Sequence, residues 1–199
     1  SSDLGNTVIL KPSEMTPSMS QVIAEIVSES FDPDFVTVFQ GNAAVASYLT
    51  QKPFDHIFFT GSPAVGKLVM AEAAKNLCSV TLELGGKSPV IIDHTADLEK
   101  AAQSICFGKF VNNGQTCIAP DYIYVHQSVR QDFLTAMSNA IDQQYGNQHQ
   151  LTTNTDYCRI VNGGHFQRIS GLINSAVEDG ASIYKGGECI ESQRFVAPT

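Results

Sequence analysis

Hydrophobic positions in the first 84 residues alternate between short β-rich runs and segments with helical spacing. The short apolar runs predict strands over residues 7–10, 35–39, 56–60 and 80–84. Helical spacing predicts helices over residues 17–30, 43–50 and 64–76, the first with the apolar stripe Val22, Ile23, Ile26 and Val27. Strands that alternate with helices predict βαβ units and a parallel sheet covered on both faces, so the predicted class is α/β.

The second half of the chain continues the mixed pattern after the pair Gly85-Gly86. It predicts strands over 90–92, 122–125 and 182–184 and helices over 98–107, 129–145 and 165–177. We place a domain boundary at the glycine pair and expect domains at residues 1–84 and 85–199. Both ends of the sequence interrupt the pattern, so we expect the first domain to be incomplete at its N-terminus and the second at its C-terminus.

Composition excludes several classes of protein. Lys and Arg number 12 against 20 Asp and Glu, a formal net charge of −8, and the cations do not cluster. That balance argues against nucleic-acid binding. Apolar runs fall far short of the ~20 residues of a membrane span, and no secretory signal is visible. Five cysteines, an odd number without a CxxC pair, argue against a disulfide framework or a zinc site and favour the cytoplasm.

The segment Gly61-Ser-Pro-Ala-Val-Gly66-Lys67-Leu68 falls between a predicted strand and a predicted helix. Backbone N–H groups at a helix start suit a pyrophosphate, so we favour a dinucleotide, with a plain structural turn as the alternative. The spacing also approaches a nucleoside-triphosphate loop, GxxxxGK[ST]. Leu68 lacks the hydroxyl that would hold Mg²⁺, and Pro63 removes an amide, so we rank the triphosphate interpretation below the dinucleotide one.

Two further groups of residues are candidates for chemistry. Lys11 and Glu14 follow the first strand and could bind ribose hydroxyls, although taken alone they are better read as a solvated turn. Glu83 ends an apolar strand, where burial would make its carboxylate a stronger base, as a general base requires. Cys117 follows a polar glycine-containing loop and could open a helix whose amides stabilise a thiolate, although a single cysteine is more often a core residue. Cys106 falls on the apolar stripe of its helix and is expected in the core.

Four motifs in this order resemble those of aldehyde dehydrogenases. They are Lys11-Pro-Ser-Glu14, Phe59-Thr-Gly-Ser62 with Gly66-Lys67, Glu83-Leu-Gly-Gly-Lys87 and Gly114-Gln-Thr-Cys117. Three further segments are most similar to the class 3 branch of fatty, aromatic and coniferyl aldehyde dehydrogenases. These are Cys117-Ile-Ala-Pro-Asp-Tyr122, Tyr157-Cys-Arg-Ile160 and His165-Phe-Gln-Arg168. The resemblance covers essentially the whole chain.

The resemblance implies a Rossmann-like cofactor domain followed by an α/β catalytic domain, and oxidation of an aldehyde to a carboxylate. Cys117 would attack the aldehyde to give a thiohemiacetal and, after hydride transfer, a thioester, which Glu83 would hydrolyse by activating water. The implied cofactor contacts are Lys11, Glu14, Gly41, Gly61, Ser62, Pro63, Ala64, Val65, Gly66 and Leu84. Glu14 favours NAD, with NADP as the alternative. The full-length protein is expected to be a homodimer.

Family motifs that would supply the second oxyanion donor, the nicotinamide-ribose contact and the dimerisation arm are missing from these 199 residues. We therefore expect the 199-residue chain alone to bind cofactor weakly and to turn over slowly or not at all. Three alternatives stay open: a CoA-acylating relative, a triphosphate-dependent enzyme, and a catalytically incomplete chain that keeps only the fold.

Overall fold

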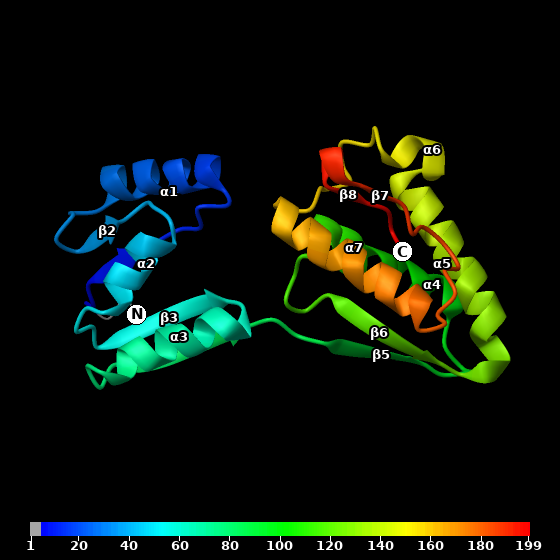
Figure 1. Ribbon diagram of the computed structural model, residues 1–199, viewed down its shortest axis with the longest axis horizontal. Coiled ribbons are helices and arrows are strands. Elements are labelled where there is room, and N and C mark those ends of the chain that lie inside the picture. Colours follow the sequence, from blue (N-terminus) through cyan, green and yellow to red (C-terminus); the bar gives the residue numbers. More distant parts are fainter. Residues whose placement is uncertain (1–4) are drawn as a thin grey trace. The chain divides into compact units, whose positions relative to one another are not determined.

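The computed structural model describes residues 5–199, which divide into two compact units (Figure 1). One unit runs up to Leu84 and the other begins at Gly85. The assignment of cofactor binding to the first unit and of catalysis to the second stays a prediction.

The first unit alternates strands and helices, as the hydrophobic pattern predicts. Its elements are β1 (Val8–Leu10), α1 (Pro17–Ser30), β2 (Val36–Val38), α2 (Ala43–Thr50), β3 (His56–Gly61), α3 (Pro63–Ala74) and β4 (Ser79–Leu84). The strands pair in parallel, β1 with β2 and β3 with β4. The predicted βαβ organisation and α/β class are therefore confirmed.

The expected sheet with both faces covered is wrong for this unit. Within the described residues, β1–β2 and β3–β4 are separate two-stranded sheets, and Ile9 (41%) and Phe58 (66%) are substantially exposed. Strand side chains alternate between faces, so a helix on one face buries only every second residue. The stripe on α1 is likewise only partly buried, since Val27 is buried while Val22 and Ile26 are exposed.

Local sequence explains where the helices of this unit begin. Asn42 caps α2, with its side-chain oxygen accepting the Ala44 N–H at 3.0 Å. Ser62 caps α3 in the same way, accepting the Val65 N–H at 3.3 Å. Pro63 occupies the first position of α3, where its missing N–H costs nothing.

The second unit contains one parallel strand pair, one short antiparallel pair and several helices. Its elements are β5 (Ser88–Ile92), α4 (Leu98–Phe110), η2 (Val111–Gly114), β6 (Pro120–Val125), η3 (Gln127–Val129), α5 (Arg130–Tyr145), α6 (Gln148–Leu151), α7 (Gly163–Glu178), β7 (Cys189–Ile190), η4 (Glu191–Gln193) and β8 (Phe195–Val196). The strand predicted over residues 182–184 is wrong, because this segment is irregular. β7 and β8, only two residues each, are too short for a hydrophobic pattern to predict.

The core of the second unit lies on one face of β5–β6 (Figure 1). Ile92 packs there with buried residues of α4 and α5, including Cys106, which is fully buried as expected. Residues of the other face are exposed, among them Ile91 (76%) and Tyr124 (66%). The alternation along β5 therefore separates a core face from an open face. Across the described residues, no helix combines the length and the apolar character of a membrane span.

Candidate active site

Lys11, Glu14 and Gly41 follow the carboxyl ends of the paired strands β1 and β2. Because these strands run in parallel, with Leu10 opposite Val38, the three residues lie at the same edge. The Lys11 Nζ donates to Glu14 Oε2 at 2.9 Å. Hydrogen bonds from its own backbone N–H and from Lys11 hold the pKa of Glu14 below its ordinary value, so this edge carries a paired carboxylate at neutral pH.

The position of Gly41 depends on the small size of glycine. Gly41 has φ of +149°, and a Cβ there would lie 2.5 Å from Val45 Cγ2. The chain thus passes from β2 into α2 with its backbone against the helix, and a side chain at Gly41 would block this approach.

The residues of the dinucleotide candidate do not form a loop. β3 ends at Gly61, Ser62 is the cap, and α3 begins at Pro63, so Ala64, Val65 and Gly66 are helical. Gly66 is buried against β4, since a Cβ there would lie 3.0 Å from Leu84 Cδ2. A triphosphate loop wraps phosphates in consecutive backbone amides outside the helix, and this short turn offers no such cradle.

Ser62 is the polar side chain at this helix start. The Ser62 side-chain oxygen accepts the Val65 N–H, and the Ser62 backbone carbonyl accepts the Gly66 N–H at 2.9 Å. The Ser62 hydroxyl hydrogen can still be donated to a phosphate oxygen, and the positive end of the helix dipole adds attraction. A bound pyrophosphate therefore fits the cap of α3.

Glu83 lies at the same end of the β3–β4 pair. It is opposite Thr60, and the next pair, Leu84 with Gly61, leads directly to the cap of α3. The burial expected for Glu83 is wrong: its side chain is exposed, because alternation along β4 turns Leu82 and Leu84 toward α3 and Glu83 away from it.

Cys117 lies in a turn of the second unit and is exposed. No helix begins there, so the expectation that helix amides stabilise its thiolate is wrong. The turn is closed by the Ala119 N–H donating to the Thr116 carbonyl at 3.2 Å, and Pro120 then begins β6. Pro120 commits the chain to extended geometry, which explains why the turn opens into a strand.

Gly86 contacts the turn that carries Cys117, a contact that the sequence pattern did not indicate. A Cβ at Gly86 would lie 2.6 Å from the backbone oxygen of Cys117, so the two backbones are in direct contact. Glycine between Glu83 and Lys87 could have been read as a close approach of two backbones. The contact fixes the Cys117 peptide group from one side.

The loop before Cys117 has an unusual backbone. Asn112, Asn113 and Gly114 all have positive φ (52°, 52° and 71°). Asparagine and glycine tolerate this region best, so the polar sequence Asn-Asn-Gly makes the turn at low strain. The sequence alone showed a flexible polar loop, whereas hydrogen bonds of Asn113 and Gln115 tie it to residues 157–161.

The five cysteines differ sharply in their surroundings. None is in a disulfide; Cys117 and Cys158 are exposed, whereas Cys106 is fully buried. Burial raises the pKa of the Cys106 thiol to about 11, which leaves it protonated and unreactive at neutral pH. Exposure alone therefore does not separate Cys117 from Cys158, and the fixed backbone around Cys117 is the distinguishing feature.

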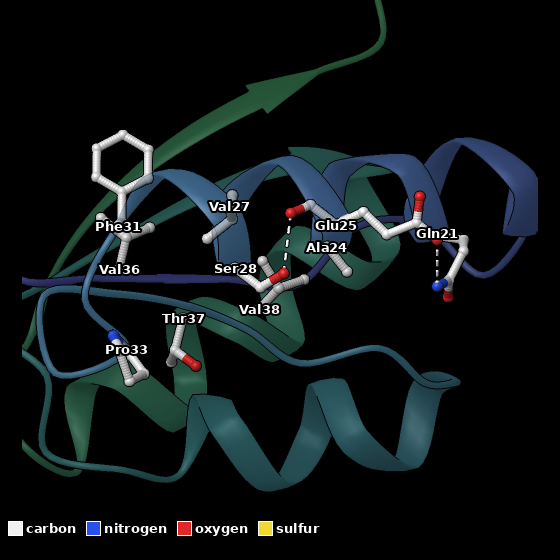
Figure 2. Close-up of a pocket in the computed structure, with 10 residues that line it drawn as sticks. All are labelled: Gln21, Ala24, Glu25, Val27, Ser28, Phe31, Pro33, Val36, Thr37 and Val38. Atoms are coloured by element: carbon white, nitrogen blue, oxygen red, sulfur yellow. Dashed lines mark hydrogen bonds between the residues drawn. The ribbon is translucent and has the colours of Figure 1, made fainter.

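Two pockets lie away from these residues. The first, about 380 Å³, lies in the first unit between α1, β2 and the segment that joins them (Figure 2). Apolar side chains such as Val27, Phe31 and Val36 line it, with Glu25 at one side. The second, about 370 Å³, lies in the second unit and is lined mainly by α5, α7 and residues 181–185. Neither contains a predicted site residue. Among the residues that the structure describes, no three His, Cys, Asp or Glu side chains gather as a metal site.

The candidate residues thus lie at three places, two in the first unit and one in the second. Lys11, Glu14 and Gly41 share one strand edge, and Glu83 joins the capped start of α3 at another. Cys117 belongs to the second unit. The meeting of Glu83 with Cys117 that the mechanism requires stays a prediction.

Comparison with known proteins identifies the group to which this chain is similar. A family model described as the aldehyde dehydrogenase family matches residues 3–199. A 4,4'-diaponeurosporen-aldehyde dehydrogenase of Staphylococcus aureus is 48% identical over 195 residues, which cover 98% of this chain and 41% of that protein. The dimeric NADP-preferring aldehyde dehydrogenase of Rattus norvegicus is 43% identical over 98% of this chain and 42% of its own length.

A solved structure gives the same result for the fold. The substrate-bound structure of Staphylococcus aureus AldH superimposes with a TM-score of 0.88 and 47% identity, over 98% of this chain and 41% of that one. The chain therefore spans about two fifths of the length of the relatives it matches. Since the family model and the fold both extend over nearly all of these residues, the chain belongs to the aldehyde dehydrogenase family.

Proposed function

We propose that the protein oxidises an aldehyde to a carboxylate with NAD as its first cofactor and NADP as the alternative. Family membership supports this reaction class. The observation that carries the proposal is the position of Cys117, an exposed thiol on a turn whose backbone rests on Gly86. A nucleophile must be both accessible and fixed, and the other exposed cysteine, Cys158, lies in an irregular segment and not in a turn.

The first step would be attack of the Cys117 thiolate on the aldehyde carbon. A carbon–sulfur bond forms and the carbonyl oxygen becomes an oxyanion, so the thiohemiacetal is a far better hydride donor than the free aldehyde. The Cys117 backbone N–H would stabilise the oxyanion, an interaction worth on the order of 3 kcal/mol in comparable sites. A bound nicotinamide would supply the hydride acceptor, and the acyl group would stay on the Cys117 sulfur as a thioester.

The second step would be hydrolysis of that thioester with Glu83 as general base. Glu83 takes a proton from water, the hydroxide attacks the acyl carbon, and the Cys117 thiolate leaves as the carboxylate forms. The exposed position of Glu83 at the end of β4 gives water direct access to the carboxylate. A CoA-acylating enzyme would use a thiol in place of this water.

The first unit offers residues suited to a dinucleotide. The Ser62 hydroxyl and the start of α3 fit a pyrophosphate, and the Lys11–Glu14 pair fits ribose hydroxyls, which accept from Lys11 and donate to Glu14. The carboxylate of Glu14 would repel the 2′-phosphate of NADP, which supports NAD as the first cofactor. Gly41, Gly61 and Leu84 would contribute backbone or apolar contacts.

Two wider properties belong to the same proposal. The full-length protein is expected to form a homodimer, since one relative is named as dimeric. A cytoplasmic location is proposed because the five cysteines are all free, as reducing compartments keep them.

The experiment is substitution of Cys117 in the full-length protein. Cys117→Ser should lower the rate of aldehyde-dependent NADH formation by about 10³-fold or more, because a hydroxyl is a far weaker nucleophile at neutral pH. Cys158→Ser, which changes the other exposed cysteine, is the matched control and should keep the wild-type rate. Retention of activity by Cys117→Ser would overturn the proposal.

A further inference from the structure

Tyr157 is a buried aromatic residue whose hydroxyl reaches the loop before Cys117. Its side chain is 2% exposed, and its oxygen lies 2.9 Å from Asn113 Oδ1 and 2.9 Å from the Val196 carbonyl oxygen. Both neighbours are acceptors, so the phenol must keep its proton to bond either of them. Burial raises the pKa of Tyr157 well above its ordinary value, so the hydroxyl stays a donor across the physiological range.

The orientation of the Asn113 amide follows from its other contacts. The Asn113 Nδ2 lies 3.1 Å from the Cys158 carbonyl oxygen and 3.5 Å from that of Val196. A flipped amide would put its oxygen against two carbonyl oxygens and its nitrogen at the phenol, losing every donor–acceptor match but one. Asn113 therefore both accepts from Tyr157 and donates to backbone near it.

The Tyr157 end of this contact is firmly anchored. Its ring packs edge-on against Tyr145 and Phe195, with ring centroids 5.2 Å and 5.9 Å apart. Arg159 holds the Tyr157 carbonyl oxygen at 2.6 Å and lies over the Phe195 ring at 5.0 Å. These residues belong to the main buried core or contact it, so Tyr157 has little freedom to move.

Gln115 makes a second connection between the loop and the same segment. Its Oε1 accepts the Val161 N–H at 2.9 Å, and its Nε2 donates to the Arg159 carbonyl at 3.2 Å. The same Nε2 donates to the Asn112 carbonyl at 2.9 Å, which closes the loop on itself. All the polar atoms of the Gln115 side chain are thus used to fix the residues just before Cys117.

We propose that Tyr157 and Asn113 are positioning residues that hold the Cys117 turn against the core, with Gln115 as a second connection. This inference rests on the proposed function for its catalytic meaning. Three consecutive residues with positive φ would otherwise leave the loop with several accessible conformations, and Cys117 follows the last of them by three positions. A nucleophile displaced by about 1 Å can lose roughly 10²-fold in rate.

The test compares three variants of the full-length protein. Tyr157→Phe removes only the hydroxyl, and Asn113→Gly keeps the positive φ while removing the amide. Tyr145→Phe is the matched control, since it removes a buried phenol of the same aromatic cluster whose hydroxyl pairs with Gln144 instead of the loop. Hydrogen exchange of residues 111–119 is measured with steady-state kinetics for an aldehyde and NAD.

We expect kcat to fall about tenfold or more in Tyr157→Phe and Asn113→Gly, with KM for NAD within about twofold. Exchange at the Gln115 and Ala119 amides, both hydrogen-bonded within the loop, should rise about tenfold in these two variants and not in Tyr145→Phe. Wild-type exchange or unchanged kcat in both loop variants would overturn the inference. An inactive wild-type protein would instead overturn the proposed function, while the exchange would still report on the loop.

Discussion

A Cβ atom at Gly86 would lie 2.6 Å from the backbone oxygen of Cys117, so these two backbones meet without room for a side chain. The contact connects the glycine pair after β4 with the turn that presents the exposed thiol. It explains why a glycine is needed at Gly86 although its φ is not in the left-handed region. A Cβ at the neighbouring Gly85 would meet no heavy atom within 4 Å, so that position is free of this constraint.

The pair of glycines provides a matched test. Gly86→Ala should push the Cys117 carbonyl away and lower kcat about 10²-fold, with a loss of about 1–3 kcal/mol in the free energy of unfolding from overpacking. Gly85→Ala should change kcat by less than about twofold. Steady-state kinetics and denaturant unfolding of the full-length variants measure both effects. Equal behaviour of the two variants would refute the role given to Gly86.

Glu83→Gln should separate acylation from hydrolysis. Without the general base, Cys117 can still be acylated, so one equivalent of NADH should appear rapidly and then turnover should slow by about 10²–10⁴-fold. Stopped-flow absorbance of NADH measures the burst, and Glu72→Gln, a change of an α3 carboxylate that pairs with Lys75 just after that helix, is the control. Addition of CoA tests the acylating alternative: a CoA ester released at the wild-type rate would contradict hydrolysis by water.

Glu14→Gln should shift cofactor choice. Removal of the carboxylate paired with Lys11 also removes its repulsion of a 2′-phosphate, so the ratio of kcat/KM for NADP to that for NAD should rise about tenfold. Glu29→Gln, at the far end of α1 from this edge, should leave the ratio unchanged. An unchanged ratio in Glu14→Gln would remove Glu14 from the proposed ribose site.

The buried thiol of Cys106 predicts how stability changes with pH. Its pKa is raised by burial from 9.0 to about 11, so the unfolded chain loses this proton first as the pH rises. The contribution of the Cys106 thiol to the free energy of unfolding is therefore fully present below pH 9. It falls between pH 9 and pH 11, by at most about 2–3 kcal/mol. Denaturant unfolding across this pH range should show a shallower fall for Cys106→Ala than for wild type. Identical slopes would contradict the buried, protonated thiol.

The hydrophobic pattern predicted the elements of the first unit well, because each helix there starts at a clear signal. Pro17 and the Asn42 and Ser62 caps mark these starts, and β-branched or aromatic runs mark the strands. The pattern could not show that Glu83 faces outward or that Ile9 is exposed, because alternation gives two faces without saying which is covered. It also missed β7 and β8, because strands of two residues are too short to show an alternating pattern.

The candidate site, too, has features that the local sequence predicts and features that depend on the rest of the fold. Cys117 and Glu83 were found from their residue types and motifs. The contacts that Gly86, Tyr157 and Gln115 make around the Cys117 loop became visible only in the structure of the second unit. The helix expected at Cys117 was wrong because Pro120 turns the chain into β6. Hydrogen bonds between residues far apart in the chain, such as those of Tyr157 and Gln115, produce no local periodic pattern in the sequence.

The most direct test of the proposed chemistry is to identify the acylated residue. Full-length Glu83→Gln is mixed with a stoichiometric aldehyde and NAD, quenched in acid, digested and analysed by mass spectrometry. The account predicts one acyl group per chain, on the peptide that contains Cys117. No acyl group at all, or an acyl group on Cys158 or another cysteine with Cys117 unmodified, would contradict it.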